Sequence, residues 1–170
     1  MNSEISIDIE APPGLVFALA HDIERWSLLL PHYVRSRSTD TDGLGRPIVE
    51  FIARRPLLPI LGLGLPVVWS SRTWNEPETN RLHFEHIAGA TRGMVVTWRI
   101  EPTGGGSCCR VTIGHAFSPA MPGFAWFVDR LFTRPIAGRT LATFKALAEA
   151  VHDVTGGATS GAASATNPSP

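Results

Sequence analysis

Charged residues are scarce in this sequence, and lysine is almost missing. Only 18% of the 170 residues are charged, and the formal net charge is zero. Lys145 is the only lysine, so 14 of the 15 basic residues are arginine. Electrostatic binding to nucleic acid needs a clustered positive face, and this composition argues against that class of protein. The arginine excess reflects either a GC-rich bacterial genome or selection for the planar guanidinium group.

Cysteine is also rare, and no targeting or membrane-spanning segment is recognisable. Cys108 and Cys109 are adjacent, so on a strand they point to opposite faces and should not form a bridge. Two thiols without a disulfide framework fit a reducing cytoplasm. The first ten residues contain three acids, unlike a signal peptide. Pro56–Ser71 is uncharged, but it contains three prolines and is shorter than the about 20 residues of a spanning helix. We therefore expect a cytoplasmic protein.

Hydrophobic periodicity predicts the order of the secondary-structure elements. Alternating isoleucines in Glu4–Glu10 indicate a half-buried strand. Two prolines then lead into a helix over Gly14–Ala20, since proline suits the first helical position. Asp22 is a candidate N-cap for a second helix, Ile23–Leu30, which ends before Pro31. Six strand-like segments at hairpin spacing follow: Tyr33–Thr41, Arg46–Arg55, Val67–Asn75, Arg81–Ala88, Gly93–Glu101 and Cys108–Ser118.

The last ordered element is predicted to be a long helix over Gly123–His152. Its apolar residues recur at three- and four-residue steps, which is typical of one buried helix face: Phe124, Phe127, Val128, Leu131, Ile136, Thr140, Phe144, Leu147 and Val151. Pro135 either kinks this helix or starts a second piece. Residues 154–170 consist mostly of small residues and proline, and we expect a disordered tail there.

This order predicts a single α+β domain over residues 1–153. The economical arrangement is a seven-stranded, curved antiparallel sheet with two short helices and a long C-terminal helix around an apolar cavity. The stretch Ile5–Tyr33 carries most of this inference, because a strand followed by two short helices suits a plug at the mouth of a curved sheet. A hollow fold of this kind predicts a small apolar ligand.

No sequence pattern indicates a metal or a cofactor. His83 and His86 are three residues apart on a predicted strand, so they face opposite sides and cannot share a metal ion. No set of Cys, His and carboxylate residues has the spacing of metal ligands. Gly62 and Gly64 form half of a dinucleotide fingerprint, but the helix that should follow is missing. We therefore predict neither a metal site nor a cofactor.

Strand parity suggests which side chains line the cavity. His115 lies on the apolar face of its predicted strand, and Trp98 lies on that of the preceding one. A structural histidine is the simpler interpretation of His115, and a ligand contact is the alternative. The five tryptophans are either core residues or cavity lining. In Val67–Asn75 both faces are partly apolar, so parity alone does not decide which face points inward.

Four segments resemble one known family. The first is IEAPPGLVFALAHDIERWSLLLPHY, with Tyr33 seven residues after Trp26. The second is WSSRTW, the third is the hairpin GMVVTWRIEPTGGGSCCRVTIGHAFSP, and the fourth is the closing helix. From about Ile5 to Val151 the chain resembles the polyketide cyclase/aromatase branch of the START-like (SRPBCC, helix-grip) superfamily. It is most similar to the aromatase/cyclases of the tetracenomycin type.

The resemblance implies a protein that binds an apolar poly-ketone or aromatic ligand and promotes aldol cyclisation and dehydration. It places a catalytic acid/base pair at Tyr33 and Arg72, facing each other across the cavity. Arg72 would stabilise an oxyanion, and the Tyr33 hydroxyl would donate or relay a proton. The candidate ligand contacts, from parity and resemblance together, are Trp26, Ser70, Trp74, Phe84, Trp98, His115, Phe127 and Leu131. Besides the small molecule, the implied partner is an acyl carrier protein.

One segment departs from the family's pattern. Pro56–Pro66, PLLPILGLGLP, is far more apolar than the usual link between the third and fourth strands. It either packs on the sheet, or forms an apolar lid at the cavity mouth or a surface that contacts lipid. A lipid-facing segment would suit a non-catalytic carrier of a lipid, a quinone or another hydrophobic metabolite. This is the alternative function, because a fold does not decide between chemistry and carriage.

Overall fold

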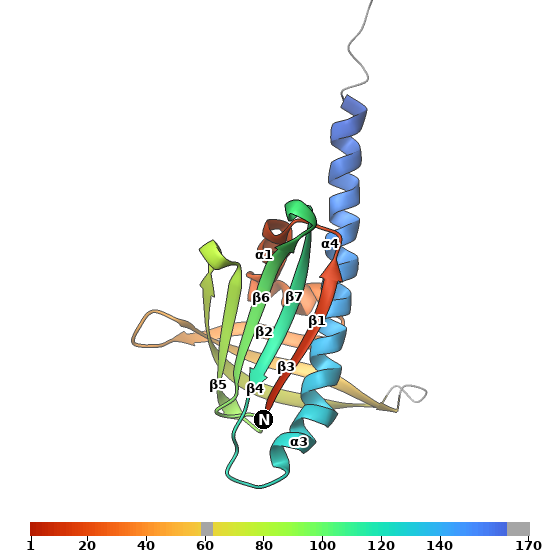
Figure 1. Cartoon of the computed structure of the whole chain (residues 1–170). Helices are drawn as coiled ribbons and strands as arrows, with labels where there is room; N and C mark the ends of the chain where they lie inside the picture. Colours follow the sequence, from red (N-terminus) through yellow and green to blue (C-terminus); the bar gives the residue numbers. More distant parts are fainter. Residues whose placement is uncertain (59–62, 163–170) are drawn as a thin grey trace, which may run out of the picture.

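The computed structural model describes residues 1–58 and 63–162, in which one curved sheet wraps around a long helix (Figure 1). The elements in chain order are β1 (Asn2–Ile9), α1 (Pro13–Ala20), η1 (Ile23–Arg25), α2 (Trp26–Leu29), β2 (Tyr33–Thr41), β3 (Pro47–Leu58), β4 (Leu63–Glu76), η3 (Pro77–Thr79), β5 (Arg81–Gly89), β6 (Val95–Thr103), η4 (Gly104–Gly106), β7 (Cys108–Ala116), α3 (Phe124–Val128), η5 (Asp129–Thr133) and α4 (Arg134–Ala162).

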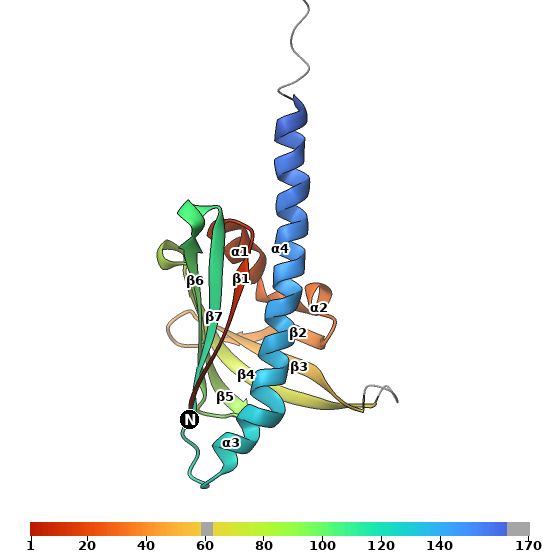
Figure 2. The same cartoon turned by 45° about the vertical axis from the view of Figure 1, so that its right-hand side comes forward.

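The seven strands form one antiparallel sheet in the order β1-β7-β6-β5-β4-β3-β2. Strands β2 to β7 follow each other as hairpins, whereas β1 pairs with the last strand, where Ile5 lies opposite Ile113. Figure 2 shows helices α1, α2 and α4 on one side of this sheet. The predicted fold class is therefore confirmed. No helix within residues 1–58 and 63–162 is both long and apolar enough to cross a membrane.

The opening segment forms as its pattern predicts, except at its second helix. In β1 the isoleucines are buried or half-buried, while Glu4 and Asp8 are exposed. Pro12 is the N-cap of α1. The second helix is shorter than predicted, because it consists of the 3₁₀ turn η1 followed by the single α-helical turn α2. Asp22 occupies the N-cap position, but its side chain makes no capping hydrogen bond and instead pairs with Arg25 at 3.3 Å.

The apolar segment between the third and fourth strands continues their hairpin. The ladder between β3 and β4 extends through the pairs Arg55 with Leu65 and Pro56 with Gly64, as far as Leu58 with Leu63. Most of Pro56–Pro66 is therefore strand, not the loop that was expected. The middle of that segment, residues 59–62, lies outside the described residues.

The C-terminal helix has a change of phase near its start. Asp129–Thr133 is π-helical, and a π turn adds one residue to a helical turn. The buried residues are consequently Val128 and Thr133, and then Ala137, Thr140, Leu141, Phe144 and Ala148. Leu131 is displaced from the buried face that a regular helix would give it. Pro135, which has no backbone N–H to donate, lies two residues after the end of the π turn.

Helix α4 extends beyond the body of the domain, as Figures 1 and 2 show. The tail boundary that was predicted at residue 154 falls inside this helix, which runs to Ala162. The helix continues past the last packed residues: Val154 is 74% exposed, and the Thr155 side-chain hydroxyl donates to the Val151 carbonyl at 2.9 Å. Residues 163–170 lie outside the described residues.

The core is built around one tryptophan from α2. Trp26 is 3% exposed, and its Nε1 donates to the Ala20 carbonyl at 2.9 Å. Its ring contacts five aromatic rings from four strands and α4, at centroid distances of 5.3 to 6.0 Å: those of Tyr33, Phe51, Phe84, Trp98 and Phe144. The short helix thereby closes one end of the space between sheet and α4.

Candidate functional site

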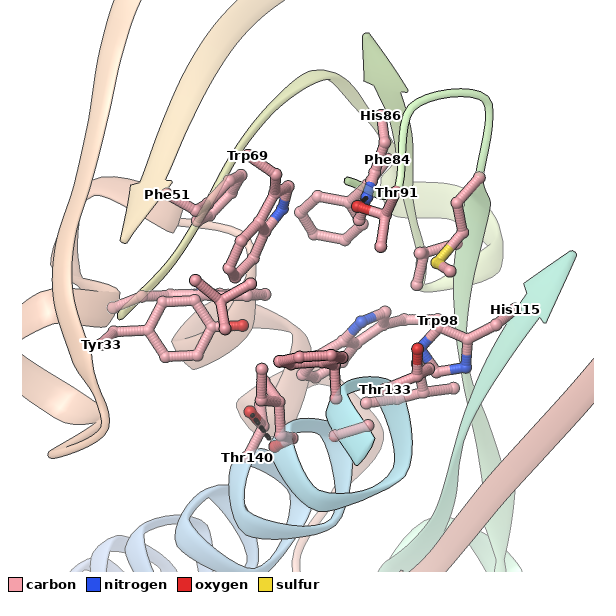
Figure 3. Close-up of a pocket in the computed structure, with 18 residues that line it drawn as sticks. Tyr33, Phe51, Trp69, Phe84, His86, Thr91, Trp98, His115, Thr133 and Thr140 are labelled. Atoms are coloured by element: carbon pink, nitrogen blue, oxygen red, sulfur yellow. Dashed lines mark hydrogen bonds between the residues drawn. The ribbon is translucent and has the colours of Figure 1, made fainter. Parts of the chain in front are cut away.

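A small cavity lies between the inner face of the sheet and the start of α4 (Figure 3). Its volume is about 90 Å³, which is less than the roughly 150 Å³ of an engineered cavity that admits benzene. Its walls are mainly aromatic and aliphatic. The lining residues are Trp26, Tyr33, Phe51, Val67, Trp69, Phe84, His86, Thr91, Met94, Val96, Trp98, Ile113, His115, Phe132, Thr133, Ile136, Ala137 and Thr140.

Tyr33 and Thr140 lie on one side of the cavity, and His86 and His115 lie on the other (Figure 3). Tyr33 begins β2 immediately after the turn that ends α2, where its N–H donates to the Leu30 carbonyl at 2.9 Å. Its ring meets the edge of Trp26 at 5.5 Å. The backbone turn and the packing together direct the phenol into the cavity.

A buried polar network supports the phenol. His32 Nε2 lies 2.9 Å from Thr140 Oγ1, and the Thr140 hydroxyl donates to the Ile136 carbonyl at 2.9 Å. Because the threonine has one hydrogen, His32 Nε2 acts as the donor in this arrangement. Burial lowers the pKa of His32 to about 4, so its ring is neutral at pH 7. Burial raises the pKa of Tyr33, whose hydroxyl also forms a hydrogen bond with Thr140.

Two more imidazoles face the cavity from the opposite side. His86 Nδ1 lies 2.6 Å from Thr91 Oγ1, and its ring stacks on Trp69 at 5.9 Å. His115 is 8% exposed, and its Nδ1 has no hydrogen-bond partner among the described residues. Burial lowers the pKa of His86 to about 3, aided by the nearby His115, and lowers that of His115 to about 4. Both rings are therefore neutral at pH 7.

The local backbone positions Trp69 and His86 against each other. A bulge between β4 and β5 shifts the register, so that Ser70 lies opposite Ala88 but Ser71 lies opposite His86. Gly89 has a φ of +93°, and a Cβ there would lie 2.5 Å from the Val68 carbonyl oxygen. Only glycine fits so close to β4 in this conformation. This approach holds the end of β5, and with it His86, beside Trp69.

The structure does not bring Arg72 and Tyr33 together. Arg72 lies on the outer face of the sheet, where its Nη1 donates to Glu85 Oε2 at 2.7 Å and its Nε lies 2.8 Å from Asp42 Oδ2. The expectation that the two side chains face each other across the cavity is therefore corrected. The reason is the parity of β4: Trp69, Ser71 and Thr73 are buried on the inner face, so Arg72 must point outward.

Several other candidate contacts also lie outside the cavity lining. Ser70 and Trp74 share the outer face with Arg72, and Trp74 stacks on His83 at 5.0 Å. Phe127 is 44% exposed and contacts the lining residue Phe132 at 6.1 Å, and Leu131 is only partly buried. The π turn explains the shift of Leu131, because it brings Phe132 and Thr133 into the lining instead, whereas Phe127 precedes that turn in α3. Four candidates do line the cavity beside Tyr33: Trp26, Phe84, Trp98 and His115.

Two lining residues that the sequence analysis missed, Trp69 and His86, are indicated by strand parity. Trp69 and His86 follow from parity once the inner face of β4 is known, since Phe84 and His86 alternate on β5. Thr140 and its partner His32 are 108 residues apart, and no local pattern joins them. The π turn could not be predicted either, because the three- and four-residue spacing of apolar residues was interpreted as that of a regular helix.

The chemistry available in the cavity is that of uncharged hydrogen-bonding groups. No Arg, Lys, Asp or Glu is among the described residues that line it. A phenol that stays protonated can donate a hydrogen bond to a carbonyl oxygen, and a neutral imidazole can accept a proton. Within the described part of the chain, no three His, Cys, Asp or Glu side chains are close enough to share a metal ion.

A second hollow lies beside η1 and the β2–β3 turn. It has a volume of about 530 Å³ and is bordered by polar and charged residues of η1, β2, β3 and β4, among them Asp22, Glu24 and Arg46. Trp74 at its edge is already stacked between His83 and Arg46, whose guanidinium carbon lies 5.2 Å from the indole centroid. Its polar groups already have partners elsewhere in the protein, as Asp22 has in Arg25 and Arg46 has in Asp42, so this hollow is a weaker ligand site than the cavity.

Known proteins share both the sequence pattern and the fold. The family model described as polyketide cyclase/dehydrase and lipid transport matches residues 9–144. No curated protein matches this sequence. The aromatase/cyclase ZhuI from Streptomyces sp. R1128 has a similar structure, with a TM-score of 0.69 and 16% identity over 88% of this chain and 93% of ZhuI.

Two further structures extend this comparison. A START superfamily protein from Mycobacterium smegmatis aligns with a TM-score of 0.60 and 16% identity over 91% of this chain and 98% of its own. BexL, a di-domain aromatase/cyclase of the BE-7585A biosynthetic pathway, aligns with a TM-score of 0.65 and 22% identity over 85% of this chain. This chain spans less than half, 45%, of BexL. At these identities the likeness concerns the fold.

Proposed function

This chain belongs to the polyketide cyclase/dehydrase and lipid transport family, and we propose that it binds a poly-ketone in its cavity and promotes aldol cyclisation and dehydration. One observation carries the proposal: a buried phenol faces two neutral imidazoles across an aromatic space without charged walls. Ketone chemistry of this type needs a base for a carbon acid and a hydrogen-bond donor for an oxygen that gains charge. The cavity offers one group of each kind.

The first step is enolisation. The unpartnered Nδ1 of His115 takes a proton from a methylene group between two ketones, and the electron pair moves onto a ketone oxygen. Burial lowers the pKa of His115 to about 4, which makes its imidazole a weak base when the cavity is empty. The enolate changes this, because an adjacent negative charge favours the protonated ring.

The second step forms the ring. The enolate carbon attacks a second ketone of the same chain, and the Tyr33 hydroxyl donates a hydrogen bond to the oxygen that becomes negative. This alkoxide takes the proton back from the imidazolium. In a further enolisation the imidazole removes a second proton next to the ketone, and the resulting enolate expels the hydroxyl group. This group takes the proton from the imidazolium and leaves as water, so the imidazole is neutral again. Tyr33 remains protonated throughout, consistent with its raised pKa, and the Thr140 and His32 network positions it.

A ligand of this size requires side-chain movement. Pockets for small molecules usually have volumes of about 300 to 1,000 Å³, whereas this cavity has about 90 Å³. Phe132 and Val67 are half-buried lining residues from the π turn and from β4. We expect them to move when a ligand enters, because most of the remaining walls belong to the packed core.

Carriage of an apolar molecule without chemistry is the second candidate. The observation that favours it is the absence of a charged side chain among the described lining residues. An oxyanion would therefore be stabilised only by neutral donors, which are weaker than a guanidinium. A lipid, a quinone or another hydrophobic metabolite needs no such stabilisation.

The deciding experiment uses a reconstituted minimal polyketide synthase that presents a poly-β-ketone chain on its acyl carrier protein. Addition of the protein should change the pattern of cyclised products, and Tyr33→Phe and His115→Gln should abolish that change. Ser70→Ala and Arg72→Gln are matched controls on the outer face, and we expect them to behave as the wild type. Identical products with and without the wild-type protein would contradict catalysis. Native mass spectrometry of the freshly purified protein then tests for a retained apolar ligand.

A further inference from the structure

Solvent reaches the cavity at one end of the molecule. The half-buried lining residues come from β4, the end of β5, the β5–β6 turn, η5 and the start of α4: Val67, His86, Thr91, Phe132 and Ile136. Figures 1 and 2 both place the described end of the β3–β4 hairpin, the β5–β6 turn and α3 at the lower end of the molecule. The cavity mouth therefore lies at this end, which we call the mouth end.

Large apolar side chains project into solvent at the mouth end. Trp126 is 67% exposed and Met121 is 60% exposed, both in or beside α3. Phe127 is 44% exposed and its ring contacts Phe132 in the cavity lining at 6.1 Å. Leu65, at the edge of the hairpin, is 43% exposed. A group of exposed aromatic and aliphatic residues at one place marks an interaction site rather than an ordinary surface.

The exposed charges in the segments that form the mouth end are mostly positive. Residues 63–70, 87–95 and 117–128 contain no acid. The exposed arginines Arg92 and Arg130 lie in or beside these segments. The nearest acid in sequence, Asp129, accepts a hydrogen bond from Ser3 at 2.7 Å and pairs with Arg134 at 2.9 Å. By contrast, the turns at the opposite ends of the strands carry acids, including Asp42 and Glu78.

We propose that the mouth end docks on an anionic lipid bilayer, with Met121, Trp126 and Phe127 entering the boundary between headgroups and acyl chains. Aromatic residues on a short helix favour that boundary, because their apolar bodies leave water. Arginines beside them meet the negative surface of anionic lipids. An acidic carrier protein would pair with the arginines, but its acidic surface would not account for the large apolar side chains that are exposed beside them. The proposal uses the cavity mouth and is independent of the ketone chemistry.

The docked orientation has a consequence for the ligand. Phe127, which would lie in the lipid boundary, touches Phe132, which lines the cavity. An apolar molecule could therefore pass between membrane and cavity without crossing water. The same route would serve a cyclised product and a carried lipid. Vesicle binding can therefore be present or absent whether or not the protein changes the products of a polyketide synthase.

The test is co-sedimentation of the full chain with vesicles of phosphatidylcholine alone or mixed with phosphatidylglycerol. We expect binding to the mixed vesicles, less binding to phosphatidylcholine, and weakening by salt. Trp126→Ala and Phe127→Ala should each reduce binding several-fold. Arg130→Gln and Arg92→Gln should each reduce binding to mixed vesicles by roughly fivefold, the effect of one cation near an anionic surface. Leu28→Ala removes an 83% exposed leucine from α2 and should bind as the wild type.

Three results would overturn the proposal. The first is equal sedimentation with and without mixed vesicles. The second is a change from dimer to monomer on Trp126→Ala in size-exclusion chromatography without vesicles, since the surface would then join two copies. The third is binding to a purified acyl carrier protein that depends on Arg130 but not on Trp126, together with no vesicle binding. Near-ultraviolet circular dichroism of each variant establishes that it is folded.

Discussion

On the inner face of the sheet, Trp69 and His86 stack beside the cavity. No charged side chain is among the described residues that line this cavity. On the outer face, Trp74 and His83 stack in a similar way, but within a group of ion pairs. There His83 Nε2 lies 3.2 Å from Glu76 Oε1, and the Arg46 guanidinium covers the other side of Trp74. The same two residue types thus occur in two different electrostatic surroundings on neighbouring strands.

The difference shows which physical effect controls each face. On the inner face, burial keeps the imidazoles and the phenol uncharged, because a charge there would lose its hydration. On the outer face, buried or half-buried charges have partners of opposite sign, as Arg72 has in Asp42 and Glu85. Polar groups on the inner face are therefore suited to ligand chemistry, and those on the outer face stabilise the strands.

The largest expected contrast is between two tryptophans. Trp26→Ala should lower the free energy of unfolding by about 3 to 5 kcal/mol, the usual cost of a buried aromatic residue, because five rings pack around it. Trp74→Ala removes one stack and one cation–π contact, and should cost about 1 to 2 kcal/mol. Urea denaturation measures both values. Equal losses would mean that the outer face is packed as tightly as the core.

The second contrast is the dependence of stability on pH. Burial lowers the pKa of His32 and His115 to about 4, and that of His86 to about 3, from an ordinary value of 6.5. The unfolded chain therefore binds more protons below pH 6.5, and stability that is complete above pH 6.5 is lost as the pH falls toward 4. Each histidine contributes a slope of up to about 1.4 kcal/mol per pH unit.

The variant that tests this slope is His86→Gln, which keeps a hydrogen-bonding group near Thr91 but does not titrate. Its free energy of unfolding between pH 6.5 and 4, measured by urea denaturation, should fall less steeply than that of the wild type. Trp74→Ala is destabilised but keeps every histidine, so it should retain the wild-type slope. If the free energies of unfolding of the wild type and of His86→Gln fall equally steeply with pH, then His86 takes up its proton over the same pH range in the folded and the unfolded protein.

The sequence predicts the strands well because most of them bury one face. Alternation in β1 and β7 marks the inner side directly, and it places His115 correctly on an apolar face. In β4 both faces carry a tryptophan, so the pattern is symmetrical and the tertiary structure decides. The family resemblance placed the face with Arg72 toward the cavity, whereas in the structure the face with Trp69 is buried.

The polar part of the site depends on contacts that no local pattern contains. His32 contacts Thr140 only because the fold brings α4 next to the turn that precedes β2. The π turn shifts the buried face of the last helices by one residue, so Phe132 lines the cavity in place of Leu131, and Thr133 lines it as well. A periodicity of 3.6 residues predicts the later part of α4 but cannot place residues before such a turn.

A smaller contrast concerns two arginines on the outer face. Arg72→Gln should lower the free energy of unfolding by about 1 to 3 kcal/mol, because it removes a charged hydrogen bond and leaves carboxylates facing each other. Arg35→Gln should change it by less than about 0.5 kcal/mol, since its pair with Glu50 is long, at 3.3 Å, and solvent-exposed. Binding of an apolar fluorescent probe should be the same in both variants. Loss of probe binding in Arg72→Gln alone would reopen a role for Arg72 in the cavity.

The smallest expected effect separates two threonines on α4 that make the same local hydrogen bond. Thr140 Oγ1 and Thr143 Oγ1 each donate to the carbonyl four residues earlier, at 2.9 Å, but only Thr140 also contacts a buried histidine. Thr140→Val should cost about 1 kcal/mol in urea denaturation, because His32 Nε2 loses its partner in the interior. Thr143→Val should be neutral within about 0.5 kcal/mol, as expected for a surface position. If both variants behave alike, the buried network contributes nothing beyond a local helix contact, and the positioning of Tyr33 must come from its aromatic neighbours.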